Sequence, residues 1–502
     1  MLEAFISGFL QVFSFPTFFL LLLGVLIGFV VGILPGIGGA ATLALMLPFV
    51  FDMKPLDAFA FLLGMLAVTS TTGDITSILF GVPGESISAA LILDGHPMAK
   101  QGEAGRALGA ALMSSLVGAV IGAFVLAVSI PIVAPLVLTF KSPEFFALAL
   151  LGITFVASLS GRSKLKGMVA AGVGLVLAMV GLDPQSGMPR YTLGMAKLWD
   201  GVGLVPVTVG LFAIPEIVDL WVTGTSIAER RHGKLGGVWQ GVKDTFIHWG
   251  VTVRCSMIGT FIGIIPGLGA GVAQWVAYAH AVQSASDKSR FGAGDVRGVL
   301  GPGAANNSGL GGSLVPTITL GVPGTVVMAL LLGAFLIKGL VPGPTMLTKH
   351  LDLIFAFAWF IVISNIITVG LCFLFLEQLA KITYVRGSLL VPGILLLVFL
   401  GAYTESNSMF DVGVALLFGC IGLIMVYADW PRPPLILGLV LGGLIERNFF
   451  ISYEIHELGF LLQPVVAIIL LVGLGVLFLP KIQELLARRF GLREGTVVSE
   501  ED

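Results

Sequence analysis

The residues of this chain that could do chemistry are hydroxyl and amide side chains beside repeated Pro-Gly motifs. Such side chains can hydrogen-bond a carboxylate without carrying a full charge into a bilayer. Helix N-termini at breaks present unpaired N–H groups that suit an anion, and unwound carbonyl oxygens suit a sodium ion. We therefore expect a substrate site among Gly36, Gly38, Thr76, Ser77, Pro83, Gly84, Ser86, Asn306, Asn307, Thr317, Thr319, Pro323, Gly324 and Thr325.

Charged residues near these motifs are few, and Asp74 lies just before the first Gly-Val-Pro-Gly. Ionisable residues at membrane depth are functional candidates by default, so Asp74 could bind a coupling cation or a proton. The alternative is that Asp74 sits at the aqueous surface and caps a helix end. With Asp74 we group Asn306, Gly267 and Gly269 as candidate cation ligands, and we expect no structural metal site.

A packing explanation competes with the functional one for the small residues. Gly, Ser and Thr let helices approach closely in membranes. The adjacent amides of Asn306 and Asn307 are harder to explain by packing, because amides without partners are costly in lipid. We favour function for the motifs taken as a set.

The chain repeats itself in two motifs. Residues 32–40 read GILPGIGGA and residues 263–271 read GIIPGLGAG. Gly-Val-Pro-Gly follows at 81–84 in the first case and at 321–324 in the second. Recurrence of the pair in the same order predicts two related halves. We place the halves at residues 1–225 and 246–480.

The motifs should interrupt membrane helices. Proline removes a backbone donor, and glycine permits dihedral angles that other residues avoid. We expect broken helices near residues 35–36 and 266–267, and re-entrant hairpins at about 75–92 and 313–335. Interrupted segments at matching places in two halves are the best sequence pointer to a transporter site.

Composition places these motifs in a membrane protein. Of 502 residues, 56% are hydrophobic and 11% are charged, with a mean hydropathy of +1.02. Soluble domains carry about 25% charged residues. A spanning helix needs about 20 mainly apolar residues, so we expect an all-α membrane protein of roughly ten to thirteen spans. The net charge of −2 gives no indication of a nucleic-acid partner.

The distribution of basic residues predicts topology. The linker 226–245 and the tail 481–502 contain basic stretches, so we expect both in the cytoplasm. The basic loop 162–166 should also be cytoplasmic, whereas its counterpart at 404–407 is acidic and polar. This difference suggests that the halves are inverted relative to each other. Residues 458–480 could form an extra helix.

With these residues in view, the sequence resembles the large membrane subunit of the tripartite tricarboxylate transporters, the TctA family. The resemblance covers nearly the whole chain. It departs from the family pattern at Gly303, where an acidic residue often stands, and at Asp74, where a second glycine is common. The matching stretches are residues 32–40, 73–106, 181–194, 210–216, 263–271 and 304–333.

The resemblance implies a secondary active importer, multi-pass in the bacterial inner membrane, with a cytoplasmic C-terminus. Its substrate would be a di- or tricarboxylate such as citrate, and a sodium or proton gradient would drive uptake without a cofactor. A small transmembrane subunit similar to TctB and a periplasmic solute-binding protein similar to TctC would be its partners.

Two other function classes remain open at this point. An intramembrane enzyme could use polar re-entrant loops, although no Gly-x-Ser-x-Gly or Walker A motif occurs. A channel could also use such loops as a selectivity filter. Two inequivalent halves with broken helices favour alternating access, and we expect an elevator-type movement.

Overall fold

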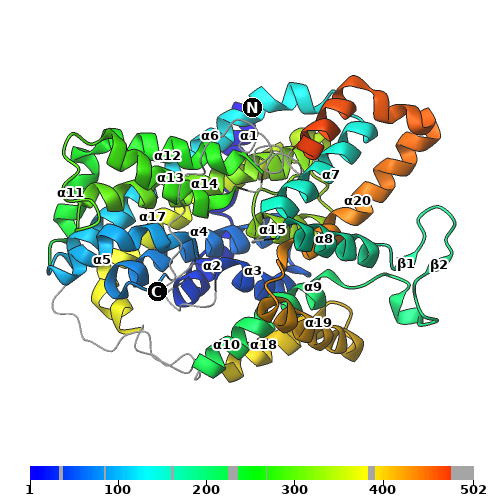
Figure 1. The fold of residues 1–502 in the computed structure, drawn as a ribbon, viewed down its shortest axis with the longest axis horizontal. Helices are drawn as coiled ribbons and strands as arrows, with labels where there is room; N and C mark the ends of the chain where they lie inside the picture. Colours follow the sequence, from blue (N-terminus) through cyan, green and yellow to red (C-terminus); the bar gives the residue numbers. More distant parts are fainter. Residues whose placement is uncertain are drawn as a thin grey trace, which may run out of the picture.

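The computed structural model describes a helical protein (Figure 1). Two short antiparallel strands, β1 (Gly181–Leu182) and β2 (Pro189–Arg190), form a hairpin that extends away from the helices. The structure describes residues 1–32, 38–83, 86–159, 163–223, 236–266, 268–382 and 391–475.

Loops and short helical turns join the described helices. Short 3-10 turns include η1 (Leu47–Val50), η2 (Ser86–Leu91) and η6 (Glu457–Leu462), and the π turn η4 (Val209–Ala213) joins two α-helices. The α-helices are α1 (Leu2–Val12), α2 (Thr17–Gly32), α3 (Gly39–Met46), α4 (Pro55–Phe80), α5 (Ile92–Lys100), α6 (Ala104–Val137), α7 (Ser142–Leu159), α8 (Lys164–Ala178), α9 (Leu204–Thr208), α10 (Ile214–Thr223), α11 (Val238–Ile247), α12 (Trp249–Ile264), α13 (Gly269–Ser284), α14 (Val296–Leu320), α15 (Val326–Ile337), α16 (Pro344–Lys349), α17 (Leu351–Ile382), α18 (Val391–Thr404), α19 (Met409–Tyr427) and α20 (Pro433–His456).

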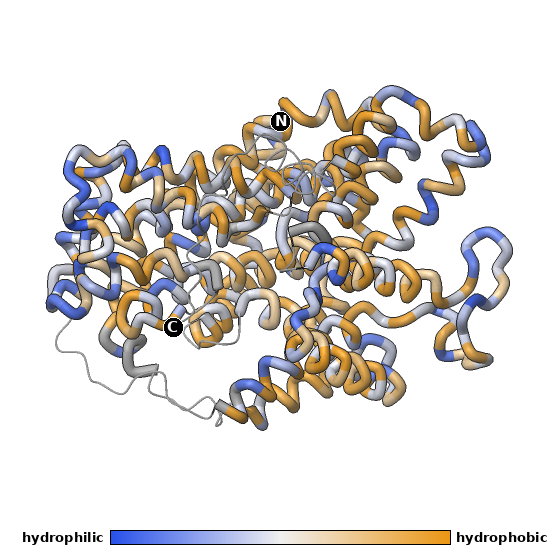
Figure 2. Tube along the Cα trace, viewed as in Figure 1, coloured by the Kyte–Doolittle hydropathy of each residue, from blue (hydrophilic) through white to orange (hydrophobic). Residues whose placement is uncertain are grey.

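Apolar residues run along most of these helices, and hydrophilic residues gather at helix ends and in the β hairpin (Figure 2). Within the described residues, five helices are long and apolar enough to cross a membrane, or up to seven if each of two bent pairs is one span. This is fewer than the ten to thirteen spans expected. The difference arises because several apolar runs form helices of 10–17 residues, which are shorter than a full span.

Two long helices, α4 and α14, lie in the interior. Pro55 begins α4 at a position where its missing N–H costs nothing, and the Asp295 side chain caps α14 by accepting from the backbone N–H of Arg297. Both helices end at a glycine in the left-handed conformation, Gly81 and Gly321, each with φ of 69°. Only glycine adopts this conformation without strain, so the two Gly-Val-Pro-Gly motifs stop their helices here.

The helices that lead into the two Gly-Val-Pro-Gly motifs are therefore longer than the hairpin arms that the sequence suggested. Residues 75–80 are the last turns of the 26-residue α4, and residues 313–320 are the last turns of the 25-residue α14. After each turn the chain continues into shorter helical pieces, η2 and α5 in the first case and α15 in the second. The many Gly, Ser and Thr residues of α14 lower its hydropathy without interrupting the helix.

Several predicted segments lie partly outside the described residues. In the linker 226–245, the described part from residue 236 leads into α11, which packs against α6. Residues 464–475 form a short apolar helix within the predicted segment 458–480. The predicted break at 35–36 and the tail 481–502 lie outside the described residues.

Candidate functional site

The helices α4 and α14 meet at a buried pair of polar side chains. The amide nitrogen of Asn306 donates to the backbone oxygen of Ser70 at 3.0 Å. The same nitrogen lies 3.3 Å and 3.4 Å from the two carboxylate oxygens of Asp74. Asp74 is 1% exposed and Asn306 is 2% exposed. Asp74 is therefore buried against an amide, which rules out the aqueous capping role.

Asn307, the next residue, binds a second set of polar groups. Its amide nitrogen lies 2.6 Å from Thr71 Oγ1, 2.8 Å from Ser115 Oγ and 2.7 Å from Asn365 Oδ1. These partners come from α4, α6 and α17, so one side chain joins four helices. We call the buried set Thr71, Asp74, Ser115, Asn306, Asn307 and Asn365 the polar crossing.

The polar crossing has unused acceptor capacity. The amide oxygens of Asn306 and Asn307 are buried and have no hydrogen-bond partner among the described residues. Buried polar atoms nearly always have a partner, so each exception needs an explanation such as a water or an ion. A carboxylate and two amide oxygens are hard oxygen donors of the kind that sodium prefers, and a carboxylate can also accept a proton.

Close packing of glycines holds α14 in place beside this set. A Cβ added at Gly118 of α6 would lie 2.1 Å from the backbone oxygen of Ala304. A Cβ at Gly259 of α12 would lie 2.6 Å from the backbone oxygen of Ala305. The helix backbones therefore touch on two sides, which is the small-residue packing of membrane helices. Close packing of helix backbones and buried polar side chains therefore occur at the same place in the protein.

The predicted site residues near the first Gly-Val-Pro-Gly motif, residues 81–84, do not share a common set of contacts. Ser77 donates to the backbone oxygen of Gly73 at 3.1 Å and to Ser88 Oγ of η2 at 2.8 Å, so it ties α4 to the segment after the turn. Thr76 donates to Gly73 within its own helix. Pro83 is half-buried beyond the end of α4. Gly84 and the side chain of Ser86 lie outside the described residues.

The second Gly-Val-Pro-Gly motif, residues 321–324, contacts the region of the second predicted helix break near residues 266–267. The Thr325 side chain accepts from the backbone N–H of Met328 and so begins α15. A Cβ at Gly324 would lie 3.2 Å from the backbone oxygen of Gly263, and a Cβ at Gly269 would lie 3.6 Å from Thr325. Pro323 is buried beside them. The structure thus brings together Gly269, Gly324 and Thr325, whereas Gly267 lies outside the described residues.

The remaining predicted residues do not join a common site through their side chains. Thr317 and Thr319 each donate to the carbonyl oxygen four residues earlier in α14, at 2.7 Å. Gly38 precedes α3, and its carbonyl accepts from Thr42. Gly36 lies outside the described residues. No group of His, Cys, Asp and Glu among the described residues could hold a metal ion.

Sequence reasoning missed Ser115 and Asn365. Asn365 stands in an apolar run of the sequence, and an amide at that depth is itself a signal of a buried polar contact. The sequence also gave no indication of the role of Asp94, which lies on α5 and is fully buried. Its carboxylate accepts from the backbone N–H groups of Gly292, Gly294 and Asp295 and from the Tyr278 hydroxyl, which fastens α5 to the segment before α14.

Comparison with known proteins gives the same family as the sequence motifs. The family model for the tripartite tricarboxylate transporter TctA family matches residues 18–437. This chain belongs to the TctA family. An Agrobacterium vitis protein named as an uncharacterized 52.8 kDa protein in the TAR-I ttuC' 3' region is 33% identical over 469 residues, which are 93% of each chain. A second Agrobacterium vitis protein, from the TAR-II ttuC' 3' region, is 30% identical over 234 residues, 46% of this chain and 97% of its own length.

No solved structure matches the chain. The TctA match identifies a multi-pass membrane transporter of tricarboxylates and confirms that the chain is not an enzyme. In this TctA member, the polar crossing lies within the matched region, because α4, α6, α14 and α17 all fall within residues 18–437.

Proposed function

We propose that the protein imports a di- or tricarboxylate such as citrate, and that a sodium or proton gradient drives the uptake. A TctC-like periplasmic solute-binding protein delivers the substrate, and a TctB-like small transmembrane subunit completes the transporter. Its place is the bacterial inner membrane, with the C-terminal tail in the cytoplasm. The support for this assembly is membership of a family of tripartite transporters.

The observation that carries the proposal is the buried contact between Asp74 and Asn306. A carboxylate inside a membrane protein is costly and is retained where it serves an ion or proton path. Beside it lies the unpartnered amide oxygen of Asn306. We assign Asp74 and Asn306 to the coupling cation, with Gly267 and Gly269 of the second break as further candidate ligands.

The carboxylate substrate would be held by the two turns and the breaks beside them. The contact of Gly324 and Thr325 with the region of Gly263 and Gly269 supports this assignment on the second side. The bond between Ser77 and Ser88 supports it on the first side. The other predicted substrate residues remain part of the proposal through their backbone groups, since the Thr317 and Thr319 hydroxyls bond their own helix.

The two halves would be structural repeats. The pair α1 and α2 is bent by 68°, and the pair α11 and α12 is bent by 80°. Each pair precedes a Pro-Gly motif, a further helix, and then a long helix that ends at a glycine with φ of 69°. This order supports the repeat, and we propose that its second copy begins with α11, at Val238 rather than at residue 246.

Contacts of α19 support inversion of the halves. Lys166, in the basic loop of the first half, donates to the backbone oxygen of Ala428 at the C-terminal end of α19. The matching acidic loop of the second half, 404–407, leads into the N-terminal end of α19. A helix of 19 residues is about 28 Å long, so matching loops would lie on opposite membrane faces. We further propose an elevator-type shift of the crossing helices against a scaffold.

The test uses proteoliposomes that hold the complete transporter with its binding protein added outside. Labelled citrate should accumulate above its external concentration when a sodium or proton gradient is imposed, and only with the binding protein present. Uptake that is indifferent to both would support the channel alternative instead.

A further inference from the structure

A pocket lined by an arginine, Arg447, lies apart from the polar crossing. Its cavity of about 310 Å³ lies between α7 and α20 on one side and the end of α14 with the segment before α16 on the other. Ligand pockets measure roughly 300–1,000 Å³, so this one suits a small organic molecule. Leu320 lines it, and on α14 this residue is about 21 Å along the helix from Asn306 at 1.5 Å per residue.

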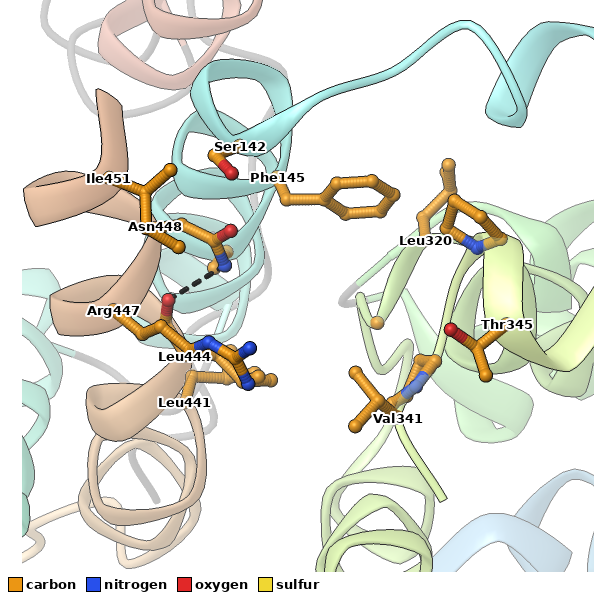
Figure 3. Close-up of a pocket in the computed structure, with 14 residues that line it drawn as sticks. Ser142, Phe145, Leu320, Val341, Thr345, Leu441, Leu444, Arg447, Asn448 and Ile451 are labelled. Carbon is orange, nitrogen blue, oxygen red and sulfur yellow. Dashed lines mark hydrogen bonds between the residues drawn. The ribbon is translucent and has the colours of Figure 1, made fainter. Parts of the chain in front are cut away.

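Arg447 supplies the positive charge of this pocket. Figure 3 shows its guanidinium extending from α20 into the space that faces Val341 and Thr345. Arg447 lies within the candidate span Pro433–Leu462 and has no hydrogen bond or ion pair to any described residue. The neighbouring Glu446 is already neutralised by Arg190 at 2.7 Å. An unpaired guanidinium inside a candidate span is a functional candidate by default.

The chemistry of the lining fits an organic acid. Most of the wall is apolar, with Phe145, Leu320 and Leu444 among the lining residues, while Ser142, Thr345 and Asn448 add neutral polar groups. A planar guanidinium binds a carboxylate through two parallel hydrogen bonds, and the exposed side chain of Arg447 is accessible to such a ligand. Gly321, the left-handed residue of the second turn, also lines the pocket and connects it to the proposed substrate site.

The pocket lies at one end of α8. Lys166 at the start of α8 contacts Ala428, whereas Met179 at its other end accepts from Arg190, which pairs with Glu446 beside Arg447. The 15 residues of α8 span about 22 Å. If Lys166 is cytoplasmic, the pocket opens toward the periplasm, where the binding protein would release substrate.

We infer that this pocket is a second carboxylate site, in which Arg447 binds the substrate outside the polar crossing. The inference rests on the proposed function, because that function makes the ligand a carboxylate. Transport would then begin with capture by Arg447, followed by passage along the second turn toward α14.

The experiment measures protection of a cysteine placed in the pocket wall. Thr345→Cys is introduced with Cys420→Ser, which removes the exposed native cysteine, and the full transporter is reconstituted in vesicles. We expect citrate to slow labelling of Thr345→Cys by an impermeant maleimide about tenfold, and Arg447→Gln to abolish the protection. Arg447→Lys should retain part of it, because the charge remains while the two-pronged geometry is lost.

Lys349→Gln is the matched control. It removes an exposed positive charge from the end of α16, and Lys349 does not line the pocket, so protection should be unchanged. Labelling that citrate does not slow, or protection that persists in Arg447→Gln, would overturn the inference. Citrate uptake is followed in the same vesicles. Uptake without protection of the cysteine would contradict the carboxylate site at Arg447 but not the proposed function. Protection without uptake would contradict the proposed function but not the site.

Discussion

Asn306 and Asp74 belong to different halves of the chain, and the amide nitrogen of Asn306 lies 3.3 Å from Oδ1 of Asp74. The contact joins the middle of α14 to the last third of α4. A cation bound by the Asp74 carboxylate would compete with this amide for the same oxygens. Under the proposed function, binding of the ion would therefore be linked to the way in which the two long helices meet.

Replacement of Asn307 by alanine should destabilise the protein and slow transport. The change leaves the buried oxygens of Thr71, Ser115 and Asn365 without their shared donor. Loss of a buried hydrogen-bond partner costs about 1–3 kcal/mol. Thermal unfolding in detergent measures the effect. Ser308→Ala is the control on the adjacent residue, whose hydroxyl bonds only its own helix, and equal stability of both variants would contradict a role for Asn307.

Substitution of Gly118 tests the close approach of α6 and α14. A Cβ at Gly118 would stand 2.1 Å from the Ala304 oxygen, so Gly118→Ala must push the helices apart. Overpacking of this kind costs typically about 1–3 kcal/mol, and displacement of α14 should also reduce uptake. Gly370→Ala in α17 is the control, since nothing lies within 4 Å of a Cβ there. Normal folding and uptake of Gly118→Ala would show that the observed helix contact is wrong.

Glu405 should make stability depend on pH. Burial raises the pKa of this loop carboxyl group from 4.5 to about 7; the backbone N–H groups of Val205 and Leu204 lower it, and the charge of Asp411 raises it. A carboxyl group with a raised pKa contributes stability that is complete below pH 4.5 and is lost as pH rises to about 7. The unfolding temperature of the wild type should therefore fall relative to that of Glu405→Gln across this window. Parallel pH profiles would contradict the raised pKa.

Labelling of two loops tests the inversion of the halves. Leu165→Cys lies in the basic loop and Ser406→Cys in the matching acidic loop, both at exposed positions and in the Cys420→Ser background. An impermeant thiol reagent outside intact cells should label Ser406→Cys and should reach Leu165→Cys only after the membrane is opened. Labelling of both from one side would exclude opposite placement.

The sequence predicted the helix ends at the two Gly-Val-Pro-Gly motifs, because glycine and proline act locally. It could not predict that Asp74 contacts Asn306. The two residues are 232 positions apart in the sequence, and their contact depends on how α4 and α14 cross. It also overvalued Thr317 and Thr319. A threonine inside a helix can satisfy its hydroxyl on the carbonyl four residues earlier, so hydroxyl content alone does not mark a site.

The family was predictable because motifs spread along the chain agree with one another, and the family match confirms it. Among the described residues, helices long enough to span a membrane are fewer than predicted, because apolar composition does not reveal where a helix ends inside the protein. The sequence did not predict a role for Arg447 for a related reason. Its significance depends on the pocket that α7, α14 and α20 form together, and no local pattern in the sequence records that arrangement.

Cation dependence of citrate uptake in Asp74→Asn proteoliposomes tests the central claim most directly. The comparison is Asp57→Asn, which changes another buried carboxylate on α4, one that accepts from Thr17 at 2.6 Å. We predict that uptake by the wild type and by Asp57→Asn rises with the imposed sodium or proton gradient, and that uptake by Asp74→Asn loses this response. An Asp74→Asn transporter with the ion response of the wild type would contradict the account.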